Sequence, residues 1–142
     1  MPKQYTRIMR AICSRPWAIM PDKLEAICEF ISLKASGVDF TKEEIARRIA
    51  SESPHAQRAG TVSSDGAVAV IPILGVISQR MGMMTDISDP GGTATEGVSK
   101  TFRAMLNDPN VKAIVFDVDS PGGTVYGVSE LAAEIFKARG QK

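Results

Sequence analysis

Apolar residues in the first third of the chain recur at the spacing of an amphipathic helix. Those that follow Pro21 and share one helix face are Leu24, Ile27, Cys28 and Ile31. Asp22 stands at a capping position, and Glu25 three residues later completes a capping box. A second box begins at Thr41 and predicts another helix. We therefore expect a small helical segment over residues 1–51.

A polar stretch separates this segment from the rest of the chain. Residues 52–66 contain almost no large apolar side chain and include Ser, Pro, His, Gln, Arg, Gly, Thr and Asp, which is typical of a linker. A β-branched run from Ala67 to Ile77 follows and is interrupted by Pro72, so it predicts either one kinked strand or a strand pair. We place the domain boundary in the linker and an α/β domain at residues 67–142.

The α/β domain alternates strands and helices. Thr93 begins a third capping box, and the helix after it ends near Asn107. Its apolar face consists of Val98, Phe102, Met105 and Leu106. The apolar run from Val111 to Val118 predicts a buried strand, and Val128 lies near the start of the last helix. This order predicts a parallel sheet with right-handed crossovers.

Two or three strands are too few to cover the faces and edges of such a sheet. Uncovered helix faces and strand edges are costly for a monomer. We therefore expect the α/β domain to be incomplete, either because the chain is truncated or because it needs a partner, and we expect a homo-oligomer.

Composition narrows the classes of partner. The 142 residues are 44% hydrophobic, and 17 Lys and Arg against 16 Asp and Glu give a net charge of +1. Such a balance exerts no bulk attraction on nucleic acid or anionic lipid. No apolar stretch reaches the roughly 20 residues of a membrane span. We therefore expect neither nucleic-acid nor membrane partners. Cys13 and Cys28 are interpreted as small core residues and are too few for a disulfide framework, so we expect a cytoplasmic protein.

Candidate chemistry is concentrated in Asp119-Ser120-Pro121-Gly122-Gly123, which joins the buried strand to the last helix. Free backbone N–H groups at such a turn, strengthened by the helix dipole, stabilise negative charge. In acyl transfer that charge develops on the oxygen of the tetrahedral intermediate. Glycine permits close approach of a substrate and positive φ. The same residues also suit a tight turn without any chemistry.

The surroundings of the turn favour the first interpretation. Asp117-Val118-Asp119-Ser120-Pro121-Gly122-Gly123 comes after Val111-Lys112-Ala113-Ile114-Val115, with Ile71-Pro72-Ile73-Leu74-Gly75-Val76-Ile77 upstream. This arrangement resembles the SppA-like (S49) serine peptidases of the ClpP/crotonase fold. Gly91-Gly92-Thr93 and the stretch with Trp17 and Pro21 are similar to the phage branch of that family, the prohead or capsid-assembly proteases.

This resemblance implies roles for particular residues. Gly123 would supply an oxyanion-hole amide, and Gly122 would allow the substrate to approach it. Thr124, Val125 and Ser78 would border the substrate channel. The family's nucleophilic serine and lysine base follow the next strand, so this chain would carry neither and would be inactive alone. Its substrates would be capsid, portal or scaffold proteins, in the host cytoplasm or the prohead.

Other interpretations stay open. The chain could be a non-catalytic capsid-assembly or scaffold-like module, a relative of bacterial signal-peptide peptidases, or a crotonase-type acyl-CoA enzyme. Ser120 is interpreted as a turn residue, and His55 as a solvated loop residue. Asp117 and Asp119 are interpreted as polar contacts at the strand end rather than a catalytic pair. No Cys/His cluster has metal-site spacing and no phosphate loop is present, so we expect neither a metal nor a cofactor.

Overall fold

The computed structural model describes residues 9–10, 12–38, 63–65, 67–80 and 92–142. The helix predicted after Thr41, the histidine at position 55 and Gly91 lie outside these residues. Most of the predicted linker also lies outside them, and its residues 63–65 form a short strand.

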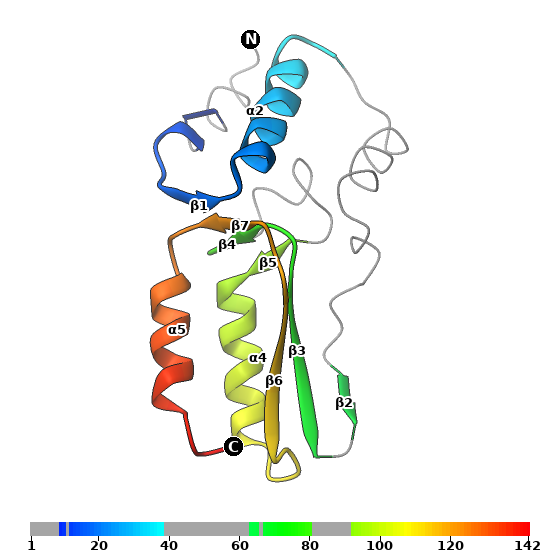
Figure 1. Ribbon diagram of the computed structural model, residues 1–142, viewed down its shortest axis with the longest axis vertical. Coiled ribbons are helices and arrows are strands. Elements are labelled where there is room, and N and C mark those ends of the chain that lie inside the picture. The colour runs from blue at the N-terminus through cyan, green and yellow to red at the C-terminus, as the bar shows by residue number, and fades with distance from the viewer. Residues whose placement is uncertain (1–8, 11, 39–62, 66, 81–91) are drawn as a thin grey trace.

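The strands form two sheets that meet at the end of the α/β part where the N-terminal elements lie (Figure 1). One sheet has the order β2-β3-β6, with β2 (Ser63–Asp65), β3 (Val68–Leu74) and β6 (Ala113–Asp119). The other has the order β1-β7-β4-β5, with β1 (Trp17–Ile19), β7 (Gly122–Thr124), β4 (Ile77–Ser78) and β5 (Thr93–Ala94). The predicted α/β class is confirmed.

The sheets are mixed rather than purely parallel. β3 pairs in parallel with β6, and β4 pairs in parallel with both β5 and β7. β2 and β1 add to these sheets as antiparallel strands. Of the two alternatives for the run from Ala67 to Ile77, the structure has two strands, and the first of them, β3, continues through Pro72, which lies opposite Asp117. The chain turns instead at Gly75, whose φ of 65° suits glycine, and then enters β4.

Three helices complete the described part: α2 (Pro21–Ala35), α4 (Thr95–Asn107) and α5 (Val128–Lys137). Their positions agree with the predictions, but the capping boxes predicted for α2 and α4 were wrong. Met20 is the N-cap of α2 and makes no side-chain cap, because Pro21 occupies the first turn. Thr93 lies in β5, where its hydroxyl donates to the Leu74 carbonyl at 2.7 Å and accepts from the Leu74 N–H at 2.8 Å.

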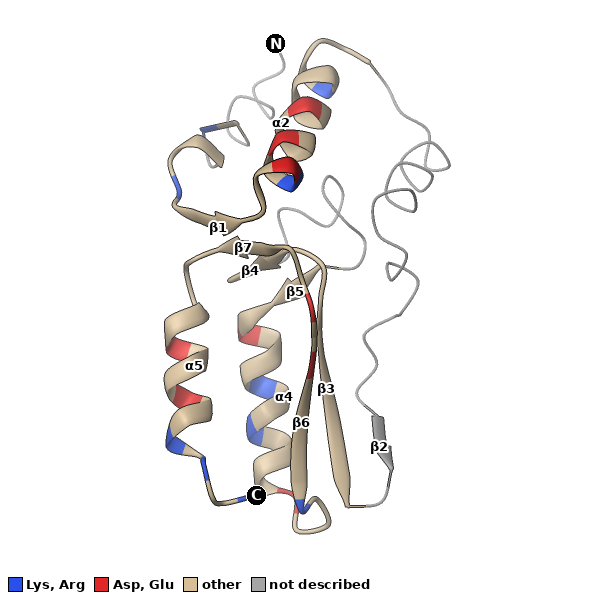
Figure 2. Cartoon of the chain, viewed as in Figure 1, with Lys and Arg blue, Asp and Glu red and all other residues tan. Residues whose placement is uncertain are grey.

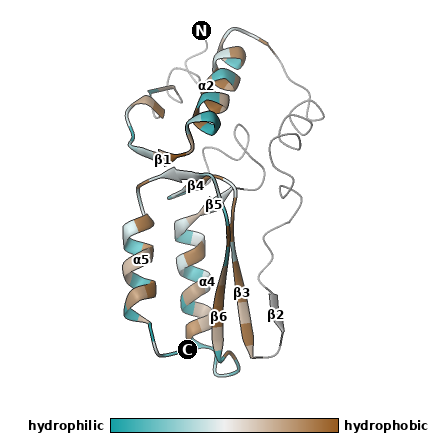
Figure 3. Cartoon of the chain, in the orientation of Figure 1, coloured by the Kyte–Doolittle hydropathy of each residue, from teal (hydrophilic) through white to brown (hydrophobic). Residues whose placement is uncertain are grey.

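Two hydrophobic cores hold these elements together. The larger core lies between the sheet and helices α4 and α5, and its buried members are Ile71, Val98, Phe102, Leu131 and Ala138. The smaller core lies under α2, and its buried members are Ile12, Ile27, Ile31 and Val76. Apolar residues accordingly line β3 and β6 in Figure 3. Val76 in the second core ties the N-terminal segment to the α/β part.

The helices carry charges of both signs along their lengths, as Figure 2 shows. None of the helices in the described ranges is long and apolar enough to cross a membrane. The interpretation of Cys13 as a core residue was wrong, because its side chain is exposed, whereas Cys28 is half-buried against the smaller core.

We expect Phe102→Ala to destabilise the chain strongly. Phe102 is 4% exposed and its ring lies 5.6 Å from that of Phe116, so truncation leaves a cavity in the larger core. The expected cost is about 3–5 kcal/mol in the free energy of unfolding, measured by urea denaturation. Phe136 is 64% exposed, and Phe136→Ala is the matched control. Equal losses in the two variants would contradict this assignment of the core.

Candidate functional site

Ser120 fastens the turn between β6 and β7. Its hydroxyl lies 2.6 Å from the Gly75 carbonyl, to which it donates, and accepts from the Gly122 N–H at 3.0 Å. The Gly75 N–H donates in turn to the Asp119 carbonyl at 2.9 Å. These bonds hold the end of β6 to the bend between β3 and β4, which supports the interpretation of Ser120 as a turn residue.

Gly122 and Gly123 bring three backbones closer together than any side chain allows. Gly122 has a φ of 102°, and a Cβ there would overlap the Ala18 carbonyl of β1. A Cβ on Gly123 would overlap the backbone of Ile77 in β4. Gly122 is therefore required by its positive φ and by space, and Gly123 by space alone. In both cases the clashing atoms belong to the backbone, so a side-chain movement could not relieve the overlap.

The structure corrects the position of these glycines relative to the last helix. They form part of a strand, β7, and not the first turn of a helix. α5 begins only at Val128, after an N-cap at Gly127. Because the effect of a helix dipole falls off within about one turn, α5 does not strengthen the glycine amides as the sequence suggested.

The amide of Gly123 faces the N-terminal segment. β1 runs antiparallel to β7, with Ala18 opposite Gly123. At the ends of this ladder the Met20 N–H donates to the Pro121 carbonyl at 2.9 Å, and the Val125 N–H to the Pro16 carbonyl at 3.3 Å. Hydrogen-bonded and non-bonded pairs alternate in an antiparallel ladder, so Ala18 and Gly123 form a hydrogen-bonded pair.

The three residues expected to border a channel lie close to this pair. Thr124 follows Gly123 in β7 and is 3% exposed, and its hydroxyl oxygen has no hydrogen-bond partner among the described residues. Ser78 is buried in β4, directly after the residue that pairs with Gly123. Val125 is 39% exposed at the end of β7. β7 and its neighbour β4 thus bring the five predicted site residues together.

The aspartates at the end of β6 and the possible metal ligands of the described residues do not form a second candidate site. Asp117 and Asp119 are both exposed at the end of β6. Within the described ranges, no three His, Cys, Asp or Glu side chains are grouped as a metal site would require.

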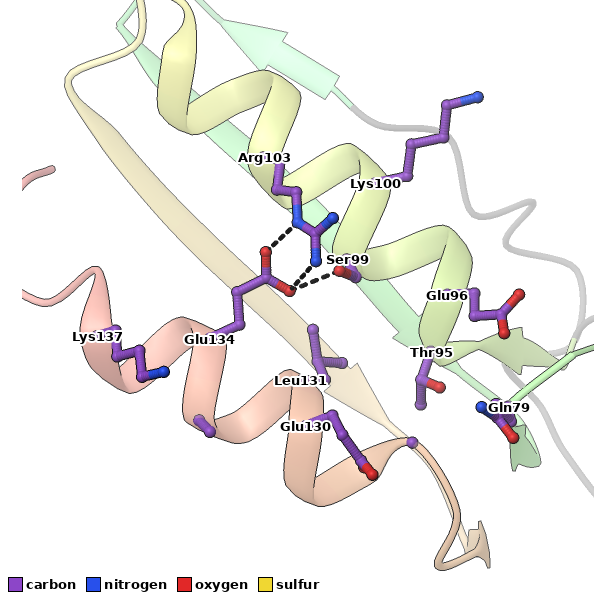
Figure 4. Close-up of a pocket in the computed structure, with 12 residues that line it drawn as sticks. Gln79, Thr95, Glu96, Ser99, Lys100, Arg103, Glu130, Leu131, Glu134 and Lys137 are labelled. Carbon is purple, nitrogen blue, oxygen red and sulfur yellow. Dashed lines mark hydrogen bonds and ion pairs between the residues drawn. The ribbon is translucent and has the colours of Figure 1, made fainter.

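A polar groove between α4 and α5 was not predicted from the sequence. Figure 4 shows Glu134 of α5 reaching across to Arg103 and Ser99 of α4. The Ser99 hydroxyl donates to one carboxylate oxygen at 2.5 Å, and the Arg103 guanidinium donates to both oxygens. The i, i+4 spacing of Ser99 and Arg103 could have indicated a shared polar face, but no local signal indicates the partner on α5.

This network changes the protonation of Glu134. Hydrogen bonds from Arg103 and then Ser99 stabilise the charged carboxylate and lower the pKa of Glu134, although partial burial opposes them. The Glu134 side chain is 23% exposed, so water screens its charge only in part.

Two phage proteins are similar to this chain. The "Head-tail preconnector protein GP5" of Enterobacteria phage P21 is 33% identical over 75 residues, which are 53% of this chain and 15% of that protein. The "Capsid assembly protease C" of Escherichia phage lambda is 29% identical over 108 residues, which are 73% of this chain and 24% of that protein. The chain thus covers less than a quarter of either relative. No known family profile and no solved structure matches it.

We expect Ser120→Ala to loosen the β6–β7 turn. The substitution leaves the Gly122 N–H and the Gly75 carbonyl without this partner, which costs about 1–3 kcal/mol in the free energy of unfolding. Urea denaturation measures the loss, and faster hydrogen exchange at Gly122 locates it. Ser32 is exposed on α2 and bonds only to the carbonyl four residues earlier, so Ser32→Ala is the control. An equally small effect in both variants would contradict the role of Ser120.

We expect acid to weaken the contact between α4 and α5. Because the folded pKa of Glu134 is lowered, its contribution is complete above the unfolded pKa of about 4.3 and is lost as the pH falls through the lower folded value. Glu134→Gln should lower stability at pH 7 and flatten its fall with acid, as measured by urea denaturation between pH 7 and pH 3. Glu25→Gln, at an exposed position of α2, serves as control. An unchanged slope in Glu134→Gln would disprove the linkage.

Proposed function

We propose that this chain supplies the oxyanion side and the peptide-binding strand of a phage head-assembly serine endopeptidase of the Ser-Lys type. One observation carries the proposal. The parallel strand β6, whose predicted burial was wrong because none of its residues is fully buried, leads through Ser-Pro-Gly-Gly into β7. The two glycines of β7 lie where a side chain would overlap the backbones of β1 and β4. The similarity to a capsid assembly protease supports the same conclusion.

The arrangement suits peptide hydrolysis. A backbone N–H held rigidly at the oxygen of the tetrahedral intermediate lowers the barrier by about 3 kcal/mol. In this role the Gly123 amide would be the donor, and Gly122 would let the substrate backbone approach it. An extended peptide that adds to a strand edge gains main-chain hydrogen bonds whatever its sequence. Thr124, Val125 and Ser78 would contact its side chains.

The rest of the catalytic machinery belongs to another part of the protein. In this proposal the serine nucleophile and lysine base follow a further strand, so the 142-residue chain alone is inactive. The substrates are capsid, portal or scaffold proteins, and processing takes place in the host cytoplasm or the prohead. The family is the S49 peptidases with the ClpP/crotonase fold, and self-association supplies the surfaces that cover this domain.

A second candidate is a non-catalytic assembly module. The name of the phage P21 relative, a head-tail preconnector protein, favours it. Apolar side chains on the surface favour it as well, since Phe136 and Val118 are 64% and 62% exposed. In this alternative the glycine turn is structural only, and the chain binds other head proteins without cleaving them.

The test compares glycine variants in the longer protein that contains this chain. Gly123→Ala keeps the backbone N–H, but its Cβ would overlap the Ile77 backbone and push the amide out of place. It should therefore lower kcat on a scaffold-protein substrate by up to the roughly 10²–10³ that loss of an oxyanion donor costs. Gly97→Ala is the matched control, because Gly97 is exposed in α4 and a Cβ there meets only ordinary contacts. Thermal melting of both variants separates lost catalysis from lost folding.

Two results would contradict the proposal. Hydrolysis of casein by the purified 142-residue chain would show that the nucleophile lies within it. A longer protein that folds but neither cleaves scaffold protein nor reacts with a fluorophosphonate probe would support the non-catalytic module.

A further inference from the structure

The strand edge that the proposed function assigns to a substrate is occupied in this structure. β1 lies along β7 at the end of the α/β part, and it comes from the N-terminal segment (Figure 1). Its three residues pair with Thr124, Gly123 and Gly122 in turn. The remaining strands of this sheet, β7, β4 and β5, all belong to the α/β part, and β1 stands outermost beside β7.

We propose that Trp17-Ala18-Ile19 is an internal occupant of the peptide-binding edge of β7 and has to leave before a substrate peptide binds. This inference rests on the proposed function. It adds that the N-terminal segment controls access to the site. The occupant has the chemistry of the expected ligand, an extended peptide that runs antiparallel to β7.

β1 and a substrate would compete for the same hydrogen-bond donor, the Gly123 N–H. The Ala18 carbonyl is the acceptor opposite the Gly123 N–H, and the developing oxyanion of a substrate needs that same N–H. A single backbone donor cannot serve both oxygens at full strength. While β1 stays in place, the oxyanion position is filled by a ground-state carbonyl of the same chain.

The approach of β1 depends on the glycines. The Ala18 carbonyl lies where a Cβ of Gly122 would stand, so the close contact exists only because that residue has no side chain. Ala18 itself is exposed and small, and it makes no contribution to either core. The centre of β1 is therefore held mainly through its backbone, as a bound peptide of variable sequence would be.

The flanking residues anchor β1 in the core under α2, which also includes Val76 of the α/β part. Trp17 and Ile19 lie on the other side of the strand from Ala18 and pack against the core under α2. The Trp17 indole N–H donates to the Ile12 carbonyl at 2.9 Å. Because β1 and α2 share a core, a movement of α2 away from β7 would carry β1 with it.

Thr124 indicates that β1 is an imperfect occupant. Its hydroxyl oxygen is buried beside the ladder and has no hydrogen-bond partner among the described residues, although Trp17 lies directly opposite. The large majority of buried side-chain polar atoms in proteins have a hydrogen-bond partner. A ligand with a polar group at that position would satisfy this hydroxyl, whereas the indole of Trp17 donates elsewhere.

The test uses the intact chain and the emission of Trp17, its only tryptophan. Ala18→Pro removes the N–H that pairs with Gly123, so β1 should leave the edge. We expect the Trp17 emission to shift to longer wavelength and the Gly123 amide to exchange with deuterium about tenfold faster or more, as loss of one hydrogen bond requires. Ala18→Gly keeps the N–H and is the matched control.

A peptide added in trans tests whether the vacated edge binds a strand. The peptide has the sequence of residues 14–22 with Trp17→Phe, so that it does not contribute to the emission. It should restore protection of the Gly123 amide in the Ala18→Pro chain. Methylation of the peptide's Ala18 nitrogen should abolish binding. Methylation of its Ile19 nitrogen should not, because Ile19 stands at a non-bonded pair.

Far-UV circular dichroism verifies that Ala18→Pro is folded. If it is not, Ile19→Ala loosens the anchor of β1 and keeps every ladder group, and it should also speed exchange at Gly123. The inference is overturned if the folded variants keep the wild-type Trp17 emission and Gly123 protection, or if both methylated peptides bind alike.

Activity then separates this inference from the proposed function. In the longer protein, Ala18→Pro should raise the rate of hydrolysis of an added peptide, whereas Ala18→Gly should not. Peptide binding with the predicted methylation pattern but without hydrolysis would mean that the proposed peptidase function is wrong and the internal occupant correct. Hydrolysis at equal rates in wild type and Ala18→Pro would keep the function and overturn the inference.

Discussion

The close approach of three backbones at Gly122 and Gly123 is the constraint on which the rest of the structure depends. β7 lies between β1 and β4, and no L side chain fits at either glycine without overlapping a neighbouring backbone. Ser120 fixes the entry to this strand by bonding both to the bend at Gly75 and to Gly122. The position of β7 is thus set by steric exclusion and a few short hydrogen bonds, with little contribution from side-chain packing.

The two hydrophobic cores have different relations to this strand. The larger core packs α4 and α5 against the β3–β6 sheet. The smaller core packs α2 and the side chains of β1 against Val76, immediately before β4. The site therefore lies where one packed unit meets another, and such positions favour ligand binding and relative movement.

The sequence predicted those elements whose signals are local. The periodicity of Leu24 to Ile31 and of Val98 to Leu106 located α2 and α4, and the apolar run before Asp117 located β6. Capping was predicted wrongly because Thr93 is close enough to Leu74 to bond its backbone instead of the helix. The proximity of Thr93 to Leu74 arises from the tertiary fold, and the residues next to Thr93 in the sequence do not indicate it.

The site was predicted only in part for the same reason. Ser-Pro-Gly-Gly marked the correct turn, but two glycines in succession are typical of a turn and not of a strand, so β7 was missed. β1 was missed because three residues are too few to show a period, and its partner lies in the distant C-terminal part of the chain. The pairing of Ala18 with Gly123 is a non-local backbone contact, and such contacts depend on shape complementarity more than on residue type. A strand recognised through its backbone can be replaced by another strand of different sequence, and this makes the same edge suitable both for an internal segment and for a substrate.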